Sequence, residues 1–372
     1  MAFKAFGIIS SADNTVHVEG LHDYRPIGAF SFLGRFRVID FPMSNMSNSD
    51  IDRVQVYVRS RPRSIAEHVG SGRHYNINSK RGRVQLLFSE NSSSRSIYNN
   101  DINAYKENLD IIQRMHQEYV IIAPSYMVYK QDYRILLDTH ISSGADITLL
   151  YQKVDNARDY FKNCHAITLN KQKGVESIEK NMGTANNKNI FMETYVMKKD
   201  TFVQLVKDAS WTSSIYTLAD IVNIKCKDMD VRAVQHKGYF ATITSLEDYY
   251  NASMELLDYE VASDLFRPNW PIYTRTTDSC PTQYYETADV KGSFVSNGCQ
   301  IEGSIENSVI GRSVVVKPGA VIKNSIVMAY ATIEEGVHIE NAVVDKWAHI
   351  IHAKEIKGEP DHPQYIKRQD TL

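Results

Sequence analysis

One short pattern occurs three times near the end of this chain, as Glu306-Asn-Ser-Val-Ile310, Lys323-Asn-Ser-Ile-Val327 and Glu340-Asn-Ala-Val-Val344. The copies begin 17 residues apart (306, 323, 340), and aliphatic residues recur through them every five or six positions. Such a period, divided into near-hexads, predicts a prism-shaped parallel β-helix in which each inward side chain stacks on its counterpart one coil away. We expect this β-helix over 290–352, with 353–372 as a C-terminal tail.

The residues before the repeat alternate between strand-like and helix-like segments, which indicates an α/β layer fold over 1–257. Expected strands are Ala5–Ile9, Val54–Val58, Tyr119–Ala123, Ile147–Tyr151 and Phe191–Met197, and expected helices are Ala104–Gln117, Tyr133–Ser142, Lys199–Lys207 and Leu246–Leu257. Residues 258–289 contain three prolines and are expected to be a linker.

Composition excludes several classes of protein. A net charge of −2 over 372 residues gives no overall field for nucleic acid or a membrane surface. The four cysteines are scattered without a CxxC pair, so neither a zinc site nor a disulfide framework is expected. The N-terminal apolar run is too short for a signal peptide, and no apolar run has the length of a membrane span. We therefore expect a cytoplasmic protein.

The segment Phe36-Arg-Val-Ile-Asp-Phe-Pro-Met-Ser-Asn-Met-Ser-Asn-Ser-Asp-Ile51 strongly resembles the ADP-glucose pyrophosphorylase (glucose-1-phosphate adenylyltransferase) family. With the repeat and the domain order, the resemblance extends over nearly the whole chain. It implies a Rossmann-like nucleotidyltransferase domain with a mixed sheet, followed by a left-handed parallel β-helix of hexapeptide repeats.

The resemblance also implies that the active site has lost its chemistry. The family's glycine-rich phosphate loop corresponds here to 12–17, which contains no glycine and places His17 at the arginine position. Glycine is needed there because backbone N–H groups must turn toward an anion. The family lysine after this loop becomes Ile27. The two aspartates that bind magnesium in the family become Ser125 or Tyr126, and Thr242. No catalytic residue and no metal ligand are therefore expected in this chain.

Other positions of the family's substrate site are mixed. A serine and a glycine at the sugar phosphate become Phe191 and Glu193, whereas the family's Glu-Lys pair is retained as Glu179-Lys180. That pair is either a remnant sugar-phosphate contact or two solvated charges.

A second set of residues is basic. Arg25, Arg35 and Arg37 correspond to a region where the family binds anionic effectors, and arginine suits phosphate because its planar fork bonds two oxygens. The basic run from Arg59 to Arg83 is expected to be a solvated face, or else an anion or partner site.

Together these features resemble the non-catalytic, regulatory subunit type of bacterial glycogen synthesis. The implied partner is a catalytic glucose-1-phosphate adenylyltransferase subunit in a heterotetramer, which would hold the Mg²⁺, while this chain alone forms a homo-oligomer and takes a small anionic effector. Three alternatives stay open: a weakly active nucleotidyltransferase, a stand-alone sugar-nucleotide or effector sensor, and a hexapeptide acyltransferase using His338, His349 or His352.

Overall fold

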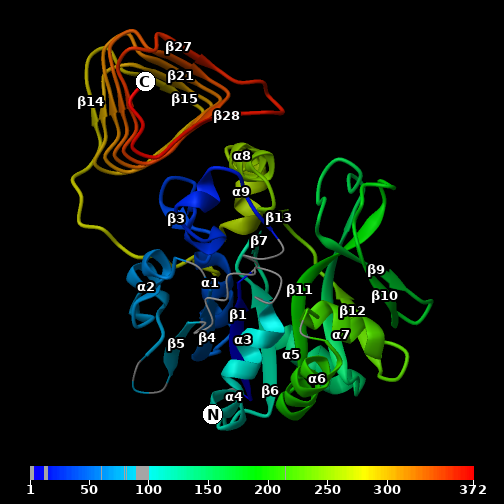
Figure 1. Ribbon diagram of the computed structural model, residues 1–372. Coiled ribbons are helices and arrows are strands. Elements are labelled where there is room, and N and C mark those ends of the chain that lie inside the picture. Colours follow the sequence, from blue (N-terminus) through cyan, green and yellow to red (C-terminus); the bar gives the residue numbers. More distant parts are fainter. Residues whose placement is uncertain are drawn as a thin grey trace.

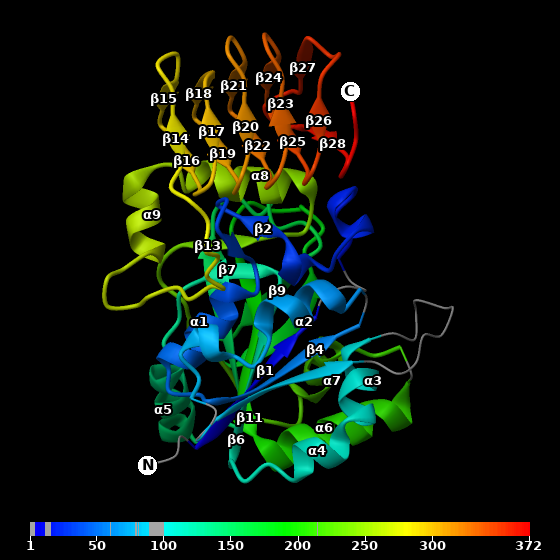
Figure 2. The ribbon, with the colours of Figure 1, turned by 90° about the vertical axis from the view of Figure 1, so that its left-hand side faces the viewer.

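The computed structural model describes residues 4–11, 16–59, 61–78, 80, 82–88, 100–213 and 215–372. An α/β domain forms the lower part of the molecule in Figure 1, and a β-helix, seen almost along its axis, lies above it. Figure 2 shows the coils of the β-helix from the side, above helix α8 (Leu246–Glu255).

A mixed nine-stranded sheet forms the centre of the α/β domain. Its strands are β1 (Ala5–Ser10), β4 (Arg53–Val58), β5 (Arg83–Phe88), β6 (Tyr119–Pro124), β8 (Ile147–Val154), β9 (His165–Leu169), β10 (Val175–Lys180), β11 (Lys188–Lys198) and β12 (Val231–Gln235). The order β10-β9-β11-β6-β1-β4-β5 is parallel from β6 to β5, and β11 lies antiparallel to both β6 and β8. The expected mixed sheet is confirmed.

Helices cover both faces of this sheet and form two separate apolar cores with it. They are α1 (Asp40–Asn48), α2 (Arg63–Val69), α3 (Asp101–Glu107), α4 (Leu109–Gln113), α5 (Tyr133–Ser143), α6 (Lys199–Thr212), α7 (Leu218–Lys225), α8 and α9 (Tyr259–Leu265). The single helix expected over 104–117 is divided at Asn108, whose side-chain amide donates to the carbonyl of Ala104 at 2.9 Å. Asparagine favours such local bonds over a continuous helix.

Short elements connect these layers near the ends of β1 and β6. They are three 3₁₀ turns, η1 (Leu21–Asp23), η2 (Ile27–Ala29) and η3 (Arg73–Tyr75), and two small antiparallel pairs, β2 (Ser31–Phe32) with β3 (Phe36–Arg37) and β7 (Met127–Tyr129) with β13 (Phe240–Thr242).

The C-terminal part consists of three parallel five-stranded sheets, which confirms the β-helix. The first sheet is β14 (Gln283–Tyr284), β17 (Gln300–Ile301), β20 (Val315–Val316), β23 (Thr332–Ile333) and β26 (His349–Ile350). The second is β15 (Asp289–Lys291), β18 (Ser304–Glu306), β21 (Val321–Lys323), β24 (His338–Glu340) and β27 (Glu355–Lys357). The third is β16 (Phe294–Val295), β19 (Val309–Ile310), β22 (Ile326–Val327), β25 (Ala342–Val344) and β28 (Gln364–Ile366).

The ends of the β-helix lie outside the 290–352 expected for it. The expected linker, 258–289, contains α9 and β14, and the expected tail, 353–372, contains β27 and β28. The first and last coils deviate from the repeat pattern because terminal coils have a neighbour on one side only. These segments are strands that pair with the neighbouring coil, β14 with β17, β27 with β24 and β28 with β25.

The β-helix is fixed to the α/β domain by buried polar contacts. Arg25 forms an ion pair with Asp345, and both side chains are buried. The Tyr365 hydroxyl donates to the same carboxylate at 2.8 Å, and the Tyr250 hydroxyl of α8 donates to the carbonyl of Asn324 at 2.6 Å. Within the described residues, no helix is both long and apolar enough to span a bilayer.

Candidate functional site

A small cavity lies where β1 ends in Ser10 and β6 ends in Pro124, the edge of the sheet where α/β proteins place their ligands. Its volume is about 50 Å³, far below the several hundred that small-molecule sites occupy. Its wall includes Arg59 from the end of β4, Asp101 from the start of α3, and Glu193 from β11. The cavity lined by these described residues is therefore too small for a nucleotide.

Three side chains lie together beside this cavity. Tyr126 is almost completely buried next to Glu193, whose carboxylate lies 3.0 Å from Nδ1 of His165. Burial and the Glu193 charge raise the pKa of Tyr126 well above its usual range. Burial disfavours charge on His165, but the bond to Glu193 and its charge outweigh this and raise the His165 pKa. We refer to these residues as the Tyr126–Glu193–His165 chain.

The backbone at Glu193 shows that the local conformation suits glycine. Glu193 has φ = 43°, in the left-handed region, and it lies in a bulge of β11 between Phe191 and Thr194. A non-glycine residue is strained there. Phe191 is fully buried beside it and packs edge-on against Tyr195 at 5.0 Å. A bulky ring and a carboxylate thus occupy a place with the backbone shape of a glycine.

The structure brings Tyr126 and Thr242 together. Residue 242 pairs with Met127 across β7 and β13, and the amide of Ile243 donates to the carbonyl of Tyr126 at 2.9 Å. Thr242 is buried beside the Cys164 thiol. Neither side chain supplies the carboxylate oxygen that Mg²⁺ prefers. The residues present do not fit a magnesium ion, and the described parts of the chain contain no group of three or more His, Cys, Asp or Glu able to hold a metal.

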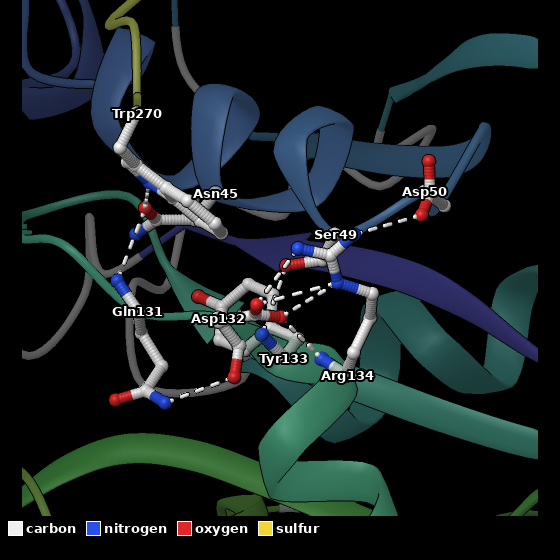
Figure 3. Close-up of polar contacts among 8 residues, drawn as sticks. All are labelled: Asn45, Ser49, Asp50, Gln131, Asp132, Tyr133, Arg134 and Trp270. Atoms are coloured by element: carbon white, nitrogen blue, oxygen red, sulfur yellow. Dashed lines mark hydrogen bonds and ion pairs between the residues drawn. The ribbon is translucent and has the colours of Figure 1, made fainter. Parts of the chain in front are cut away.

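The two aspartates nearest to these positions have structural contacts. Asp132 caps the start of α5 by accepting from the amide of Arg134 at 2.9 Å, and it also pairs with that arginine's guanidinium at 2.8 Å. Figure 3 shows Arg134 extending further to Asp50, at 3.1 Å. Asp248 accepts from the Thr244 hydroxyl, and burial raises its pKa. Neither carboxylate is available to replace a lost metal ligand.

Asn45 of α1 holds the backbone beside this network. Its side-chain amide donates to the carbonyl of Tyr129 at 3.0 Å. Its oxygen accepts from the amide of Gln131 and the indole of Trp270, at 3.2 Å and 3.1 Å (Figure 3). Ser49 Oγ accepts from the amide of Tyr133 at 2.8 Å. These contacts fix β7 and the start of α5, and with them Tyr126.

The remaining positions inferred from the family are scattered around this region. Ser125 is buried and donates its amide to the carbonyl of Ser10 at 2.9 Å. Ile27 is buried in η2, and His17 is exposed and stacks on His22 with ring centroids 5.0 Å apart. Residues 12–15 of the expected phosphate loop lie outside the described residues.

The retained Glu179-Lys180 pair forms the exposed end of β10. Lys180 lies opposite His165, so the pair is adjacent to the Tyr126–Glu193–His165 chain. Among the residues that the structure describes, neither side chain makes a hydrogen bond or an ion pair.

A basic crevice at the junction of the two domains contains the three predicted arginines. One cavity, of about 440 Å³, is lined by Arg35, Arg37, Arg275, Arg312 and Lys346. A second, of about 490 Å³, is lined by Arg25, Arg37, Arg61, Arg63, Lys346 and Arg368. Arg37 and Lys346 form part of both walls, so the cavities adjoin. We refer to the two together as the junction crevice.

The junction crevice has unsatisfied donors. Nε of Arg25 and Nε of Arg312 are buried without a hydrogen-bond partner. Burial, followed by the charges of Arg37 and Arg25, lowers the pKa of Lys346 to about 7. Buried donors without partners are costly unless an anion or water meets them. The crevice is therefore suited to a small polyanion.

Residues 23–259 match the nucleotidyl transferase family model, and residues 280–365 match the model of the GlmU-like C-terminal hexapeptide. Glycogen biosynthesis protein GlgD of Bacillus subtilis is 30% identical over 365 residues, 98% of this chain and 96% of the relative. This chain belongs to the glucose-1-phosphate adenylyltransferase family of nucleotidyl transferases. GlgD of Geobacillus stearothermophilus is 30% identical over 86% of this chain and 83% of its own length. The glucose-1-phosphate adenylyltransferase of Lachnospira eligens is 31% identical over 78% of this chain and 68% of its own length.

Sequence reasoning missed the part of the crevice that the β-helix and the preceding segment supply. Arg275, Arg312, Lys346 and Arg368 were not predicted as site residues. Arg312 and Lys346 are 34 residues apart, two repeats of 17, so they occupy one column of coils, with Ala329 between them in the same cavity wall. Applying the 17-residue period to the polar residues, as well as to the aliphatic ones, would have predicted that Arg312 and Lys346 lie in one column. The basic run is divided, since Arg59 lines the small cavity, whereas Arg61 and Arg63 line the crevice.

Proposed function

We propose that this chain is a non-catalytic regulatory subunit of glucose-1-phosphate adenylyltransferase, acting in the cytoplasm in glycogen biosynthesis. The partner reaction is ATP plus glucose 1-phosphate giving ADP-glucose and pyrophosphate. The observation that carries the proposal is the Tyr126–Glu193–His165 chain: the centre of the site is filled by the protein's own side chains, while the fold around it is intact.

The names of the relatives support the pathway. Two relatives are called glycogen biosynthesis proteins, and others of the same family are called glucose-1-phosphate adenylyltransferases. A chain without chemistry can still change a partner's activity if it contacts the active and inactive conformations with different free energies. The junction crevice supplies a way to alter those contacts, because an anion bound there would hold the β-helix and the α/β domain together.

The experiment measures ADP-glucose formation with Mg²⁺ for this chain, for a catalytic homologue from the same genome, and for their mixture. We expect negligible turnover from this chain alone, co-elution of the two chains as a hetero-oligomer, and a changed turnover or effector response in the mixture. If the two chains elute separately and the partner's kinetics are unchanged at micromolar concentrations, the regulatory proposal is wrong and a stand-alone sensor is favoured.

A substitution tests the crevice separately. Arg312→Gln removes charge from one wall and should reduce the response of the mixture to sugar phosphates, while leaving its basal turnover unchanged. Arg232→Gln is a matched control. Arg232 lies on β12, away from the crevice, and its exposed side chain pairs with Asp230 at 2.7 Å. An equal loss of response in both variants would argue against the crevice as the effector site.

A further inference from the structure

Lys346 lies in the wall of both cavities of the junction crevice and is partly buried. Of the described residues that line the crevice, eight are arginines, one is this lysine, and the carboxylates are Glu67 and Asp278. Glu67 is already paired with Arg63 at 2.7 Å. Arginine keeps its proton at physiological pH, whereas a buried lysine loses it readily. The excess positive charge of the crevice is therefore most easily relieved at Lys346.

The carboxylate next to Lys346 in the sequence is occupied by other donors. Asp345 forms its ion pair with Arg25, and it accepts from the Tyr365 hydroxyl at 2.8 Å and from the backbone amide of Lys346 at 2.6 Å. Within the part of the chain that the structure describes, the Lys346 ammonium has no ion-pair partner. No carboxylate therefore holds the proton on this lysine.

The surroundings of Lys346 favour its neutral form. Burial and the charges of Arg37, Arg25 and Arg368 lower the pKa of Lys346 to about 7, and the charge of Asp345 opposes them only in part. At neutral pH much of this side chain is therefore an unprotonated amine, and such an amine is a nucleophile. The arginines that disfavour an ammonium here would stabilise an anion in the same place.

Two of these arginines have donors that nothing accepts. Nε of Arg25 and Nε of Arg368 are both buried without a hydrogen-bond partner. The Arg368 guanidinium lies over the ring of Trp347, 4.7 Å from its centre, so the aromatic face orients it. Buried donors without acceptors are costly, and arginine bonds carboxylate oxygens with its planar fork. A carboxylate carried by Lys346 would bring two acceptor oxygens to these donors.

We propose that carbon dioxide carboxylates Lys346, giving a carbamate that the arginines of the junction crevice stabilise. The lone pair of Nζ forms a bond to the carbon of CO₂, one C=O π bond becomes a lone pair on oxygen, and one proton leaves the nitrogen for water. The carbamate takes donors that a bound phosphate would use, so dissolved CO₂ weakens anion binding in the crevice. The modification needs this chain alone and does not depend on the proposed partner subunit.

The test uses the purified full-length chain and ¹³C-labelled bicarbonate under a fixed pressure of CO₂. We expect a carbamate resonance, separate from those of bicarbonate and dissolved CO₂, that grows as the pH rises through about 7. A trialkyloxonium salt converts a carbamate into a stable ester, and peptide mass spectrometry should locate that ester on Lys346. The α-amino group of the chain also reacts near neutral pH, and the peptide map separates it from the lysine.

Three variants test the assignment. Lys346→Arg keeps the positive charge but has no amine that forms a carbamate, so the ester at this position and its part of the resonance should be lost. Arg368→Gln removes a charge and a donor but leaves the lysine, and it should lower the carbamate about threefold or more. Lys323→Arg is the matched control, because Lys323 lies in the same β-helix and pairs with Glu306 at 3.0 Å. It should leave the ester on Lys346 unchanged.

Three results would each overturn the proposal. The first is the absence of an ester on Lys346 at pH 8, including the case in which bicarbonate binds only as a free anion. The second is an ester that is as frequent on Lys323 as on Lys346. The third is an amount of carbamate that Arg368→Gln does not lower. The regulatory proposal would survive all three, because the mixture with the catalytic homologue tests it separately.

Discussion

Single side chains explain why the site is closed. Tyr126, which directly precedes β7, lies near Thr242 of β13, and Glu193 lies next to Tyr126 in a strained bulge. These residues block the site together, so replacing one of them leaves the others still blocking it. The effects of single substitutions on activity are therefore not additive.

Thr242→Asp alone should not give measurable ADP-glucose formation, because Tyr126 still fills the space and the phosphate loop still lacks glycine. Thr242→Asp combined with Tyr126→Asp should also fail, since Glu193 would repel a sugar phosphate. The measurement is ADP-glucose production with Mg²⁺, and the catalytic homologue is the positive control. Turnover of ~1–100 s⁻¹, ordinary for phosphoryl-transfer enzymes, from either variant would refute this prediction.

Asp101 should make stability depend on pH. Burial raises its pKa from 3.8 to about 6, despite the opposing charge of Arg59. The folded state therefore binds the proton more tightly than the unfolded state, and stability is lost as the pH rises from about 4 to about 6. Above pH 6 the ionised Asp101 lowers the free energy of unfolding by its full amount, about 2 kcal/mol after allowance for water in the cavity.

Asp101→Asn should raise the free energy of unfolding more at pH 7.5 than at pH 4.5, measured by urea denaturation at both values. Asn can still accept from the amides of Leu218 and Ile102. The exposed Asp110 of α4 is the control, because its side chain is 61% exposed and Asp110→Asn should change the free energy of unfolding little. If Asp101→Asn raised the free energy of unfolding more at pH 4.5 than at pH 7.5, the prediction would be wrong.

At the scale of elements, asparagines at one corner of the β-helix allow its sharp turns. Asn307, Asn324 and Asn341 follow one another at intervals of 17 residues, with φ of 45°, 44° and 50°. Asparagine tolerates the left-handed region better than most residues, and glycine tolerates it best. This corner precedes β19, β22 and β25, the three inner strands of the third sheet, and residues of these strands pack in the core of the α/β domain.

Asn324→Ala should lower the free energy of unfolding by about 1 kcal/mol, whereas Asn324→Gly should change it by less than about 0.5 kcal/mol. Both substitutions keep the carbonyl that accepts from Tyr250, so the comparison isolates the backbone conformation. Thermal or urea unfolding measures the difference. Equal effects of the two substitutions would show that the side chain, and not φ, matters at this corner.

At the scale of the whole molecule, the Arg25–Asp345 ion pair joins the two domains inside the junction. Replacing one partner leaves a buried charge, so Arg25→Met should cost about 3–5 kcal/mol. The double variant Arg25→Met with Asp345→Leu should recover much of that loss. Urea unfolding of the single and double variants tests both statements.

Arg63→Met is the control for this prediction. Arg63 lines the same cavity but is 90% exposed, in an i,i+4 pair with Glu67. Its replacement should leave the unfolding free energy almost unchanged. If Arg25→Met is as mild as Arg63→Met, the two domains are held together by other contacts.

The sequence by itself determined the architecture and the family. The 17-residue period determines the β-helix, because each coil must place an aliphatic side chain inward at every turn. The segment Phe36–Ile51 indicated the nucleotidyltransferase domain, and missing glycines and aspartates can be read from the sequence without coordinates. Local periodicity and residue chemistry are properties of the chain alone, so these features could be predicted.

Only the tertiary structure decided what replaced the lost groups and where the remaining charges gather. Tyr126, Glu193 and His165 come from three different segments, and no spacing predicts that they meet. The same holds for Arg25 and Asp345, which are 320 residues apart. These contacts are non-local, and folding the chain is what creates them.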